Sequence, residues 1–237
     1  MKGFCKVSTM PLRAEPSDRS EMVSQLLFGE FFEKIGDSEK GDWIKIKCLN
    51  DGYEGFIDPK QISFLEDVEF NIYINRKPQL TGKIFTAAYF HQKPVRIPQG
   101  GDLRVFGNKD APEKIDNSHF AVSYLGVPYL WGGRSPFGID CSGLSQVIFA
   151  NNNIQLPRDA HEQATLGKEI DFGKHNIWDL AFFKNENDKI IHVGILLREN
   201  DVLHAHGEVK ISQLTKEGLL HDNGINLTHK LAFIKRI

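Results

Sequence analysis

One cysteine in this sequence stands in a setting that favours chemistry. Cys141 lies near the end of YLWGGRSPFGIDCSG, a stretch in which four glycines and a proline lead into an apolar run. Asp140 is a good helix N-cap, and apolar residues recur at helical spacing from Leu144, so we expect Cys141 in the first turn of a buried helix. Free N–H groups and the positive end of the helix dipole favour a thiolate there. The pattern indicates a nucleophile, with an inert buried thiol as the alternative.

A cysteine nucleophile needs a base, and three histidines stand out as candidates. His192 interrupts the apolar run KIIHVGILL, where an imidazole is costly to bury unless it is hydrogen-bonded or functional. The next run, DVLHAH, offers His204 and His206 on one face. A hairpin centred near Arg198 would place His204 directly across from His192, as the third member of a triad. His206 stays open as an alternative third member.

A metal site is an alternative use of the same three histidines, because a strand H-x-H pair with a third histidine resembles a zinc ligand set. Cys141 gives the histidines a simpler use, so we expect no metal and no cofactor. The other two cysteines, Cys5 and Cys48, are scattered and form no C-x-x-C pair. We expect both to be inert reduced thiols.

Composition excludes several classes of partner. The chain has 237 residues, 41% of them hydrophobic, and carries 29 basic against 31 acidic side chains. This favours an ordered globular chain of one or a few domains, with no nucleic-acid and no membrane partner. The opening residues lack the apolar stretch of a signal peptide, which predicts a cytoplasmic protein; the alternative is an extracytoplasmic protein whose leader has been removed. The sequence leaves the oligomeric state open.

Two halves of different character must position these residues. Short β-type runs separated by turn signals predict a small barrel over residues 1–66. NIYI, KIFTAAYF and DLRVFG predict a second barrel or a β-rich linker over 67–110. Residues 111–237 mix the two element types: helices are expected near 115–125, 141–151 and 159–167, and strands at DLAFFK, KIIHVGILL, DVLHAH and KLAFIKRI. This half is therefore predicted to have an α+β fold.

Five of these motifs occur in a recognisable order. YLWGGRSPFGIDCSG, LPRDA, DLAFF, HVGILL and VLHAHG together resemble the NlpC family of papain-like bacterial cell-wall cysteine peptidases. The front half resembles the bacterial SH3-like domains that precede such domains. PSDRSEMVSQLLFGE is similar to the subgroup that cleaves the γ-D-glutamyl to L-diamino acid bond of murein peptides. The resemblance implies a papain-like α+β domain, with helices packed on an antiparallel sheet, behind one or two SH3-like barrels.

The resemblance assigns catalytic roles to four residues. It implies Cys141 as nucleophile, His192 as general base and His204 as the polar third residue. It also places Tyr129 near the nucleophile, where its hydroxyl and the Cys141 backbone N–H would form an oxyanion hole. The reaction implied is acyl transfer through a thioester.

Further residues are implied in substrate binding. Asp140 and Ser142 would line the pocket for the residue before the cleaved bond, with Asp140 placed to meet a terminal amine. In the barrel, Tyr53 is the expected contact of the substrate's N-terminus, with Glu21 as a further carboxylate. Arg158 at the start of a helix is interpreted as structural and is left out of the site.

The implied function is a hydrolase that trims peptidoglycan-derived peptides bearing a free N-terminal L-Ala, in cell-wall peptide recycling. The alternatives are another papain-like amidase or acyltransferase, and a wall-binding protein with an inert catalytic domain. One position departs from the family pattern. Trp178 stands where the family usually has glycine, which questions the local turn but not the triad.

Overall fold

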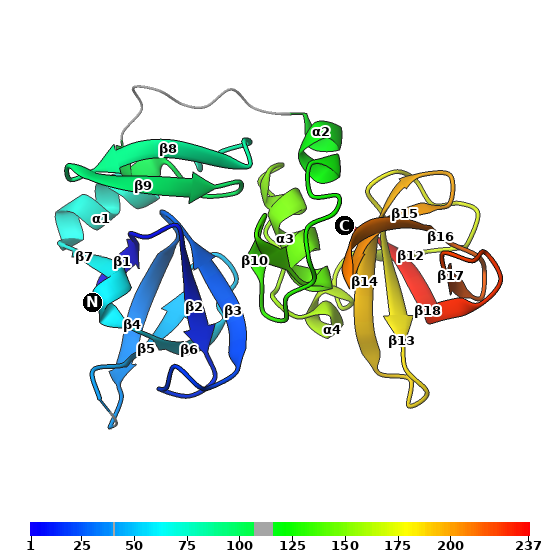
Figure 1. The fold of residues 1–237 in the computed structure, drawn as a ribbon, viewed down its shortest axis with the longest axis horizontal. Coiled ribbons are helices and arrows are strands. Elements are labelled where there is room, and N and C mark those ends of the chain that lie inside the picture. The colour runs from blue at the N-terminus through cyan, green and yellow to red at the C-terminus, as the bar shows by residue number, and fades with distance from the viewer. Residues whose placement is uncertain (40, 107–115) are drawn as a thin grey trace.

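The computed structural model describes residues 1–39, 41–106 and 116–237, and its first unit is the expected small antiparallel barrel (Figure 1). The spatial order is β3-β2-β6-β5-β4-β1-β7. The strands are β1 (Lys2–Cys5), β2 (Thr9–Arg13), β3 (Met22–Leu27), β4 (Phe31–Asp37), β5 (Ile44–Cys48), β6 (Glu54–Ile57) and β7 (Ile62–Leu65), with a short 3₁₀ helix η1 (Pro59–Gln61) before β7. Cys5 and Cys48 are free thiols in its core, and burial raises the pKa of both.

The next segment differs from the expected second barrel. It consists of a helix, α1 (Asp67–Ile74), a two-stranded hairpin of β8 (Phe85–Phe90) and β9 (Lys93–Pro98), and a 3₁₀ turn, η2 (Arg104–Phe106). Two of the expected β runs are wrong, because NIYI belongs to α1 and residues 104–106 of DLRVFG form η2. Acidic side chains in the first turn of α1 favour a helix start, and Phe70 packs edge-on against Phe31 of the barrel, 5.9 Å between ring centroids.

The C-terminal half has the expected α+β organisation. Its helices, α2 (Asn117–Val122), α3 (Cys141–Ala150) and α4 (Ala160–Gln163), lie between the barrel and a curled sheet (Figure 1). That sheet has the order β12-β18-β13-β14-β15-β16, with β17 beside β18 and antiparallel pairing. The strands are β12 (Lys168–Ile170), β13 (Leu180–Lys184), β14 (Ile190–Arg198), β15 (Asp201–His206), β16 (Glu208–Gln213), β17 (Gly218–Leu220) and β18 (Leu227–Arg236). A small ribbon, β10 (Arg134–Ser135) and β11 (Gly138–Ile139), precedes α3.

The structure contains the expected elements of this half, but two of its helices are shorter than expected. The helix over 141–151 and the four named strands are confirmed. The helix expected over 159–167 is a single turn, and the one near 115–125 spans Asn117–Val122. Its expected first apolar residue, Ile115, and the domain boundary expected at 110–111 lie outside the described residues. Within the described part of the chain, no helix has the length and apolar character needed to span a bilayer.

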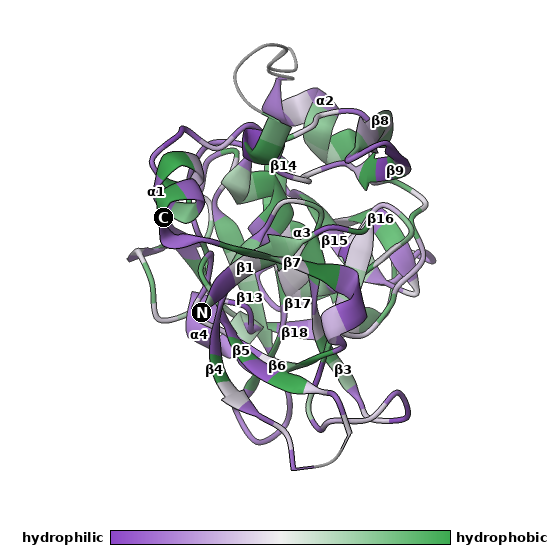
Figure 2. Cartoon of the chain, turned by 90° about the vertical axis from the view of Figure 1, so that its left-hand side faces the viewer, coloured by the Kyte–Doolittle hydropathy of each residue, from purple (hydrophilic) through white to green (hydrophobic). Residues whose placement is uncertain are grey.

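The curled sheet carries a hydrophobic core on each face. One core joins the sheet to the helices and includes Leu144, Val193 and Leu203. The other lies within the curl and includes Phe183 and Leu196. Alternation along β14 therefore sends successive side chains to different cores. Figure 2 shows the apolar residues of α3 and the neighbouring strands in the middle of the molecule.

Buried polar contacts fix the barrel against the loop that precedes α3. The Arg134 guanidinium forms two hydrogen bonds to the Glu30 carboxylate, at 2.7 and 2.9 Å, and a third to the Gln25 carbonyl. Gly132 has a φ of +75°, and a Cβ there would lie 2.2 Å from the Met22 carbonyl oxygen. Only glycine allows the loop to come this close to β3. The barrel is thus part of the wall around Cys141.

Candidate active site

Cys141 occupies the first turn of α3, as the sequence predicts. The Asp140 side chain caps the helix by accepting a 2.7 Å hydrogen bond from the Gly143 N–H. Cys141 is 9% exposed, and its thiol lies against the backbone of Val193, the residue after His192 in β14. Packing of α3 on the sheet therefore brings the nucleophile next to the strand that carries the expected base.

The two expected histidines and a serine form a buried hydrogen-bonded chain. His192 Nε2 lies 3.0 Å from His204 Nδ1, and His204 Nε2 lies 2.9 Å from Ser212 Oγ. If each Nε2–H donates along this chain, the Nδ1 lone pair of His192 is the one available to accept the thiol proton. Ser212 was not singled out in the sequence, because nothing in EVKISQ distinguishes it from an ordinary strand serine.

The strand register that brings His204 to His192 differs from the expected one. Ile195 pairs with Leu203, so the hairpin turns later than Arg198 and His204 comes beside Gly194 instead of directly across from His192. A Cβ on Gly194 would lie 3.2 Å from the His204 Cβ. The bare glycine leaves room for the His204 ring to reach His192 diagonally.

His204, and not His206, is the residue bonded to the expected base. The His206 ring is stacked 6.4 Å from that of His204, farther along β15. The three-histidine metal arrangement also lacks support, because the facing nitrogens of His192 and His204 bond each other. Among the described residues no group of three or more histidines, cysteines or carboxylates is arranged to hold a metal ion.

Burial favours the neutral forms of the Cys141 thiol and the His192 imidazole. Desolvation, followed by the nearby Asp140 carboxylate, raises the pKa of the Cys141 thiol to about 12. Burial, with smaller contributions from His229 and His204, holds the pKa of His192 well below its usual value. Both shifts favour the uncharged groups, in the direction opposite to the thiolate expected from the helix terminus, because desolvation is the largest cause of each.

A cleft of about 420 Å³ opens over the thiol. It gathers every substrate-binding residue expected from the sequence: Tyr129, Asp140 and Ser142 from the catalytic domain, and Tyr53 and Glu21 from the barrel. The remaining lining residues are Val23, Trp131, Cys141, Arg158, Asp159, Ala160, His161, Ile190 and Ile191. Residues more than a hundred positions apart thus face one cavity.

Arg158 belongs to this cleft, although the sequence reading left it out. Its guanidinium is 2% exposed and pairs with both carboxylate oxygens of Asp140. It also donates to Ser142 Oγ at 2.8 Å and, across the domain boundary, to Ser24 Oγ at 3.0 Å. The charge of Asp140 is therefore already compensated within the protein. The sequence around Arg158 does not indicate this ion pair, because the partners of the guanidinium lie far away in sequence.

The barrel wall of the cleft is held by two hydrogen bonds to the catalytic domain. The Trp131 indole N–H donates to Glu21 Oε1 at 2.6 Å. The Tyr53 hydroxyl donates to Asp159 Oδ2 at 3.2 Å. Tyr129 lines the cleft beside Cys141, and burial raises the pKa of its phenol to about 12, so the hydroxyl keeps its proton.

Comparison with known proteins agrees with this geometry. Residues 126–222 match the NlpC/P60 family, and residues 12–62 match the bacterial dipeptidyl-peptidase SH3 domain. A γ-D-glutamyl-L-lysine dipeptidyl-peptidase of Bacillus subtilis is 45% identical over 216 residues, which cover 77% of this chain and 71% of that protein. The chain belongs to the NlpC/P60 family. It is a cysteine peptidase with an N-terminal SH3-like domain.

Two further relatives cover nearly the whole NlpC/P60 chain. Dipeptidyl-peptidase 6 of Lysinibacillus sphaericus is 25% identical, with 92% of this chain and 93% of that protein aligned. The crystal structure of an NlpC/P60 family protein from Bacillus cereus superposes with a TM-score of 0.79 at 21% identity, covering 100% and 99% of the two chains. This similarity shows that the papain-like domain and its barrel share one fold with that protein.

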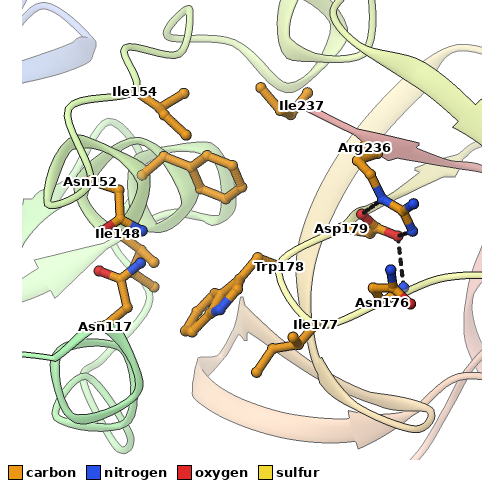
Figure 3. Close-up of a pocket in the computed structure, with 11 residues that line it drawn as sticks. Asn117, Ile148, Asn152, Ile154, Asn176, Ile177, Trp178, Asp179, Arg236 and Ile237 are labelled. Atoms are coloured by element: carbon orange, nitrogen blue, oxygen red, sulfur yellow. Dashed lines mark hydrogen bonds and ion pairs between the residues drawn. The ribbon is translucent and has the colours of Figure 1, made fainter.

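Trp178, the residue that the resemblance predicts to depart from the family pattern, lies near the C-terminal end of α3. Its φ is +74°, the left-handed region that a glycine would adopt without strain. The indole borders a second cavity, of about 350 Å³, next to Ile148 and opposite the Asp179–Arg236 ion pair (Figure 3). The turn thus keeps a glycine-type backbone with a tryptophan in place.

Proposed function

We propose that this enzyme hydrolyses the γ-D-glutamyl to L-diamino acid bond of murein peptides that carry a free N-terminal L-Ala. The observation that carries the proposal is the composition of the cleft: Cys141 lies in the same cavity as Glu21 and Tyr53 of the barrel. A carboxylate and a phenol in the same cleft as the expected nucleophile suit the terminal ammonium group of a short peptide. The B. subtilis relative, named for γ-D-glutamyl-L-lysine dipeptides, supports the same bond.

The catalytic residues are Cys141 and His192, oriented by His204. The sulfur attacks the γ-carbonyl carbon while His192 Nδ1 takes the thiol proton, and the tetrahedral oxyanion is met by the Tyr129 hydroxyl and the Cys141 backbone N–H. His192 then passes the proton to the amine of the diamino acid as the C–N bond breaks. Water, deprotonated by His192, hydrolyses the thioester and restores the thiol.

The remaining cleft residues have separate roles in this proposal. The Asp140–Arg158 pair fixes Ser142 and the first turn of α3, because all three are joined by hydrogen bonds. Since Arg158 compensates Asp140, the ammonium group meets its main charge at Glu21, with Asp159 behind Tyr53. This places the end of the peptide against the barrel wall and limits the substrate to short free peptides. A cytoplasmic location and a role in recycling stay predictions.

The test is hydrolysis of L-Ala-γ-D-Glu-L-Lys and of its diaminopimelate counterpart, each with a free and an N-acetylated terminus. We expect cleavage of the free peptides, at least a tenfold loss on acetylation, and no cleavage by Cys141→Ala. Cys48→Ala, which removes a buried thiol of the barrel core, is the matched control. Cleavage that survives Cys141→Ala would overturn the proposal. Amine incorporation in preference to hydrolysis would reassign the enzyme as an acyltransferase, and a thiol unreactive toward iodoacetamide would favour wall binding alone.

A further inference from the structure

A fourth histidine lies directly on the proposed base. The His229 ring of β18 is stacked on that of His192, with 4.2 Å between centroids and an interplanar angle of 21°. Phe183 of β13 also packs on His192, at 5.7 Å and 45°. The base therefore lies in a cage of flat rings.

The sheet register explains how His229 reaches this position. Phe183 is paired with His192 on one side and with Leu231 on the other, so these side chains share a face of the sheet. His229 is two residues from Leu231 along β18 and therefore lies on that face. Its Nδ1 is 3.0 Å from Thr228 Oγ1, which fixes the ring edge. Nothing in LTHKLAF predicted a role for this histidine, because β18 is far from the other histidines in sequence.

We propose that His229 is a positioning residue, which holds the plane of the His192 ring and thereby the direction in which its second nitrogen, Nδ1, points. This inference rests on the proposed role of His192 as the base. The hydrogen bond to His204 fixes one ring nitrogen only, and the ring could still tilt about that contact. The His229 ring, stacked with 4.2 Å between centroids, blocks this tilt and shields the His192–His204 hydrogen bond from water.

The charge state of His229 suits this task. During acylation His192 becomes an imidazolium, and a second positive charge stacked on it would oppose proton transfer. The groups that face His229 are the rings of His192, His204, His206 and Phe183, the Thr228 hydroxyl, and the ammonium group of Lys210. Burial, aided by His206 and Lys210, lowers the pKa of His229 to about 4, so that the ring is neutral at pH 7.

Two substitutions separate a stacking role from simple space filling. His229→Asn keeps a polar group beside Thr228 and removes the ring, whereas His229→Phe keeps a flat ring and removes the imidazole nitrogens. We expect His229→Asn to lower kcat about tenfold with KM within about twofold, a part of the ~10²–10⁴ that general base catalysis contributes. We expect His229→Phe to stay within about threefold of the parent. His221→Asn, in an exposed turn, is the matched control.

A second readout needs no peptide substrate. The rate of alkylation of Cys141 by iodoacetamide depends on proton transfer to His192, and we expect the same order: parent, His229→Phe, then His229→Asn. Failure of the parent to cleave murein peptides would overturn the proposed function but leave this comparison intact. Equal rates for His229→Asn and the parent, or equal losses for both variants, would overturn the positioning role. If His229→Asn does not fold, His229→Phe decides: retained activity supports stacking, and lost activity refutes it.

Discussion

The two walls of the cleft are built differently. On the catalytic side, Asp140, Ser142 and Arg158 are 4%, 6% and 2% exposed and are bonded to one another. On the barrel side, Glu21 is exposed and Tyr53 half-buried. The first wall is preorganised, since each polar group is held before any substrate arrives. The second presents groups that water reaches, so it suits recognition of a charged terminus. In the proposed function, chemistry and recognition are therefore divided between the two domains.

Removing the buried charge of Arg158 is the strongest test of this difference between the two walls. Arg158→Met leaves the Asp140 carboxylate buried without its partner, and we expect a loss of about 3–5 kcal/mol in the free energy of unfolding. Activity should fall as well, because Asp140 caps α3 at the nucleophile. Urea denaturation measures the first effect. Lys174→Met is the control: its ion pair with Asp171 is 76% exposed on both sides, so solvent screens it and its loss should leave the free energy of unfolding nearly unchanged. Similar losses in the two variants would contradict a preorganised wall.

Lowering the pH should destabilise the curled sheet more than the barrel. The barrel residues 1–66 contain no histidine, whereas the curled sheet buries His192 and His204. Burial lowers the pKa of His204 from 6.5 to about 3, so below pH 6.5 the unfolded chain takes up a proton that the folded chain refuses. Stability of the sheet is therefore complete above pH 6.5 and falls as the pH drops toward 3, by an amount on the order of several kcal/mol. Hydrogen exchange at pH 7 and pH 5 measures this for each strand. Equal loss of protection in the barrel would show that the domains unfold as one unit.

The barrel wall should affect binding more than chemistry. Glu21→Gln removes the charge but keeps the shape, and a hydrogen bond to a charged group contributes about 1.5–3 kcal/mol. We expect KM for the free peptide to rise about tenfold or more while kcat stays within about threefold. Glu15→Gln, an exposed carboxylate of the same barrel outside the cleft, should change neither constant. An N-acetylated peptide should not distinguish Glu21→Gln from the parent. A fall in kcat alone would place Glu21 in the chemistry instead.

The sequence predicted the local features of this site better than the distant ones. The cap at Asp140 and the helix from Cys141 follow from neighbouring residues, and both are found. The partnership of His192 and His204 is also found, but by a diagonal contact past Gly194, since turn residues alone do not determine strand register. Arg158, Trp131 and His229 were missed because their partners lie 18 to 134 residues away. NIYI was misread because its β-type composition outweighed the helix start before it.

The smallest expected effect lies far from both walls, at Trp178. A non-glycine residue at a φ of +74° carries strain of about 1–2 kcal/mol, while the half-buried indole packs against the helix-side core. Trp178→Gly relieves the strain and loses the packing; Trp178→Ala loses the packing and keeps the strain. We therefore expect both variants to be destabilised, with Ala about 1 kcal/mol worse than Gly, the reverse of their usual order. Thermal unfolding measures the order, and kcat within about twofold of the parent would show that the catalytic wall is independent of this end of α3. If Ala is the more stable variant, the turn relaxes on substitution and Trp178 stores no strain.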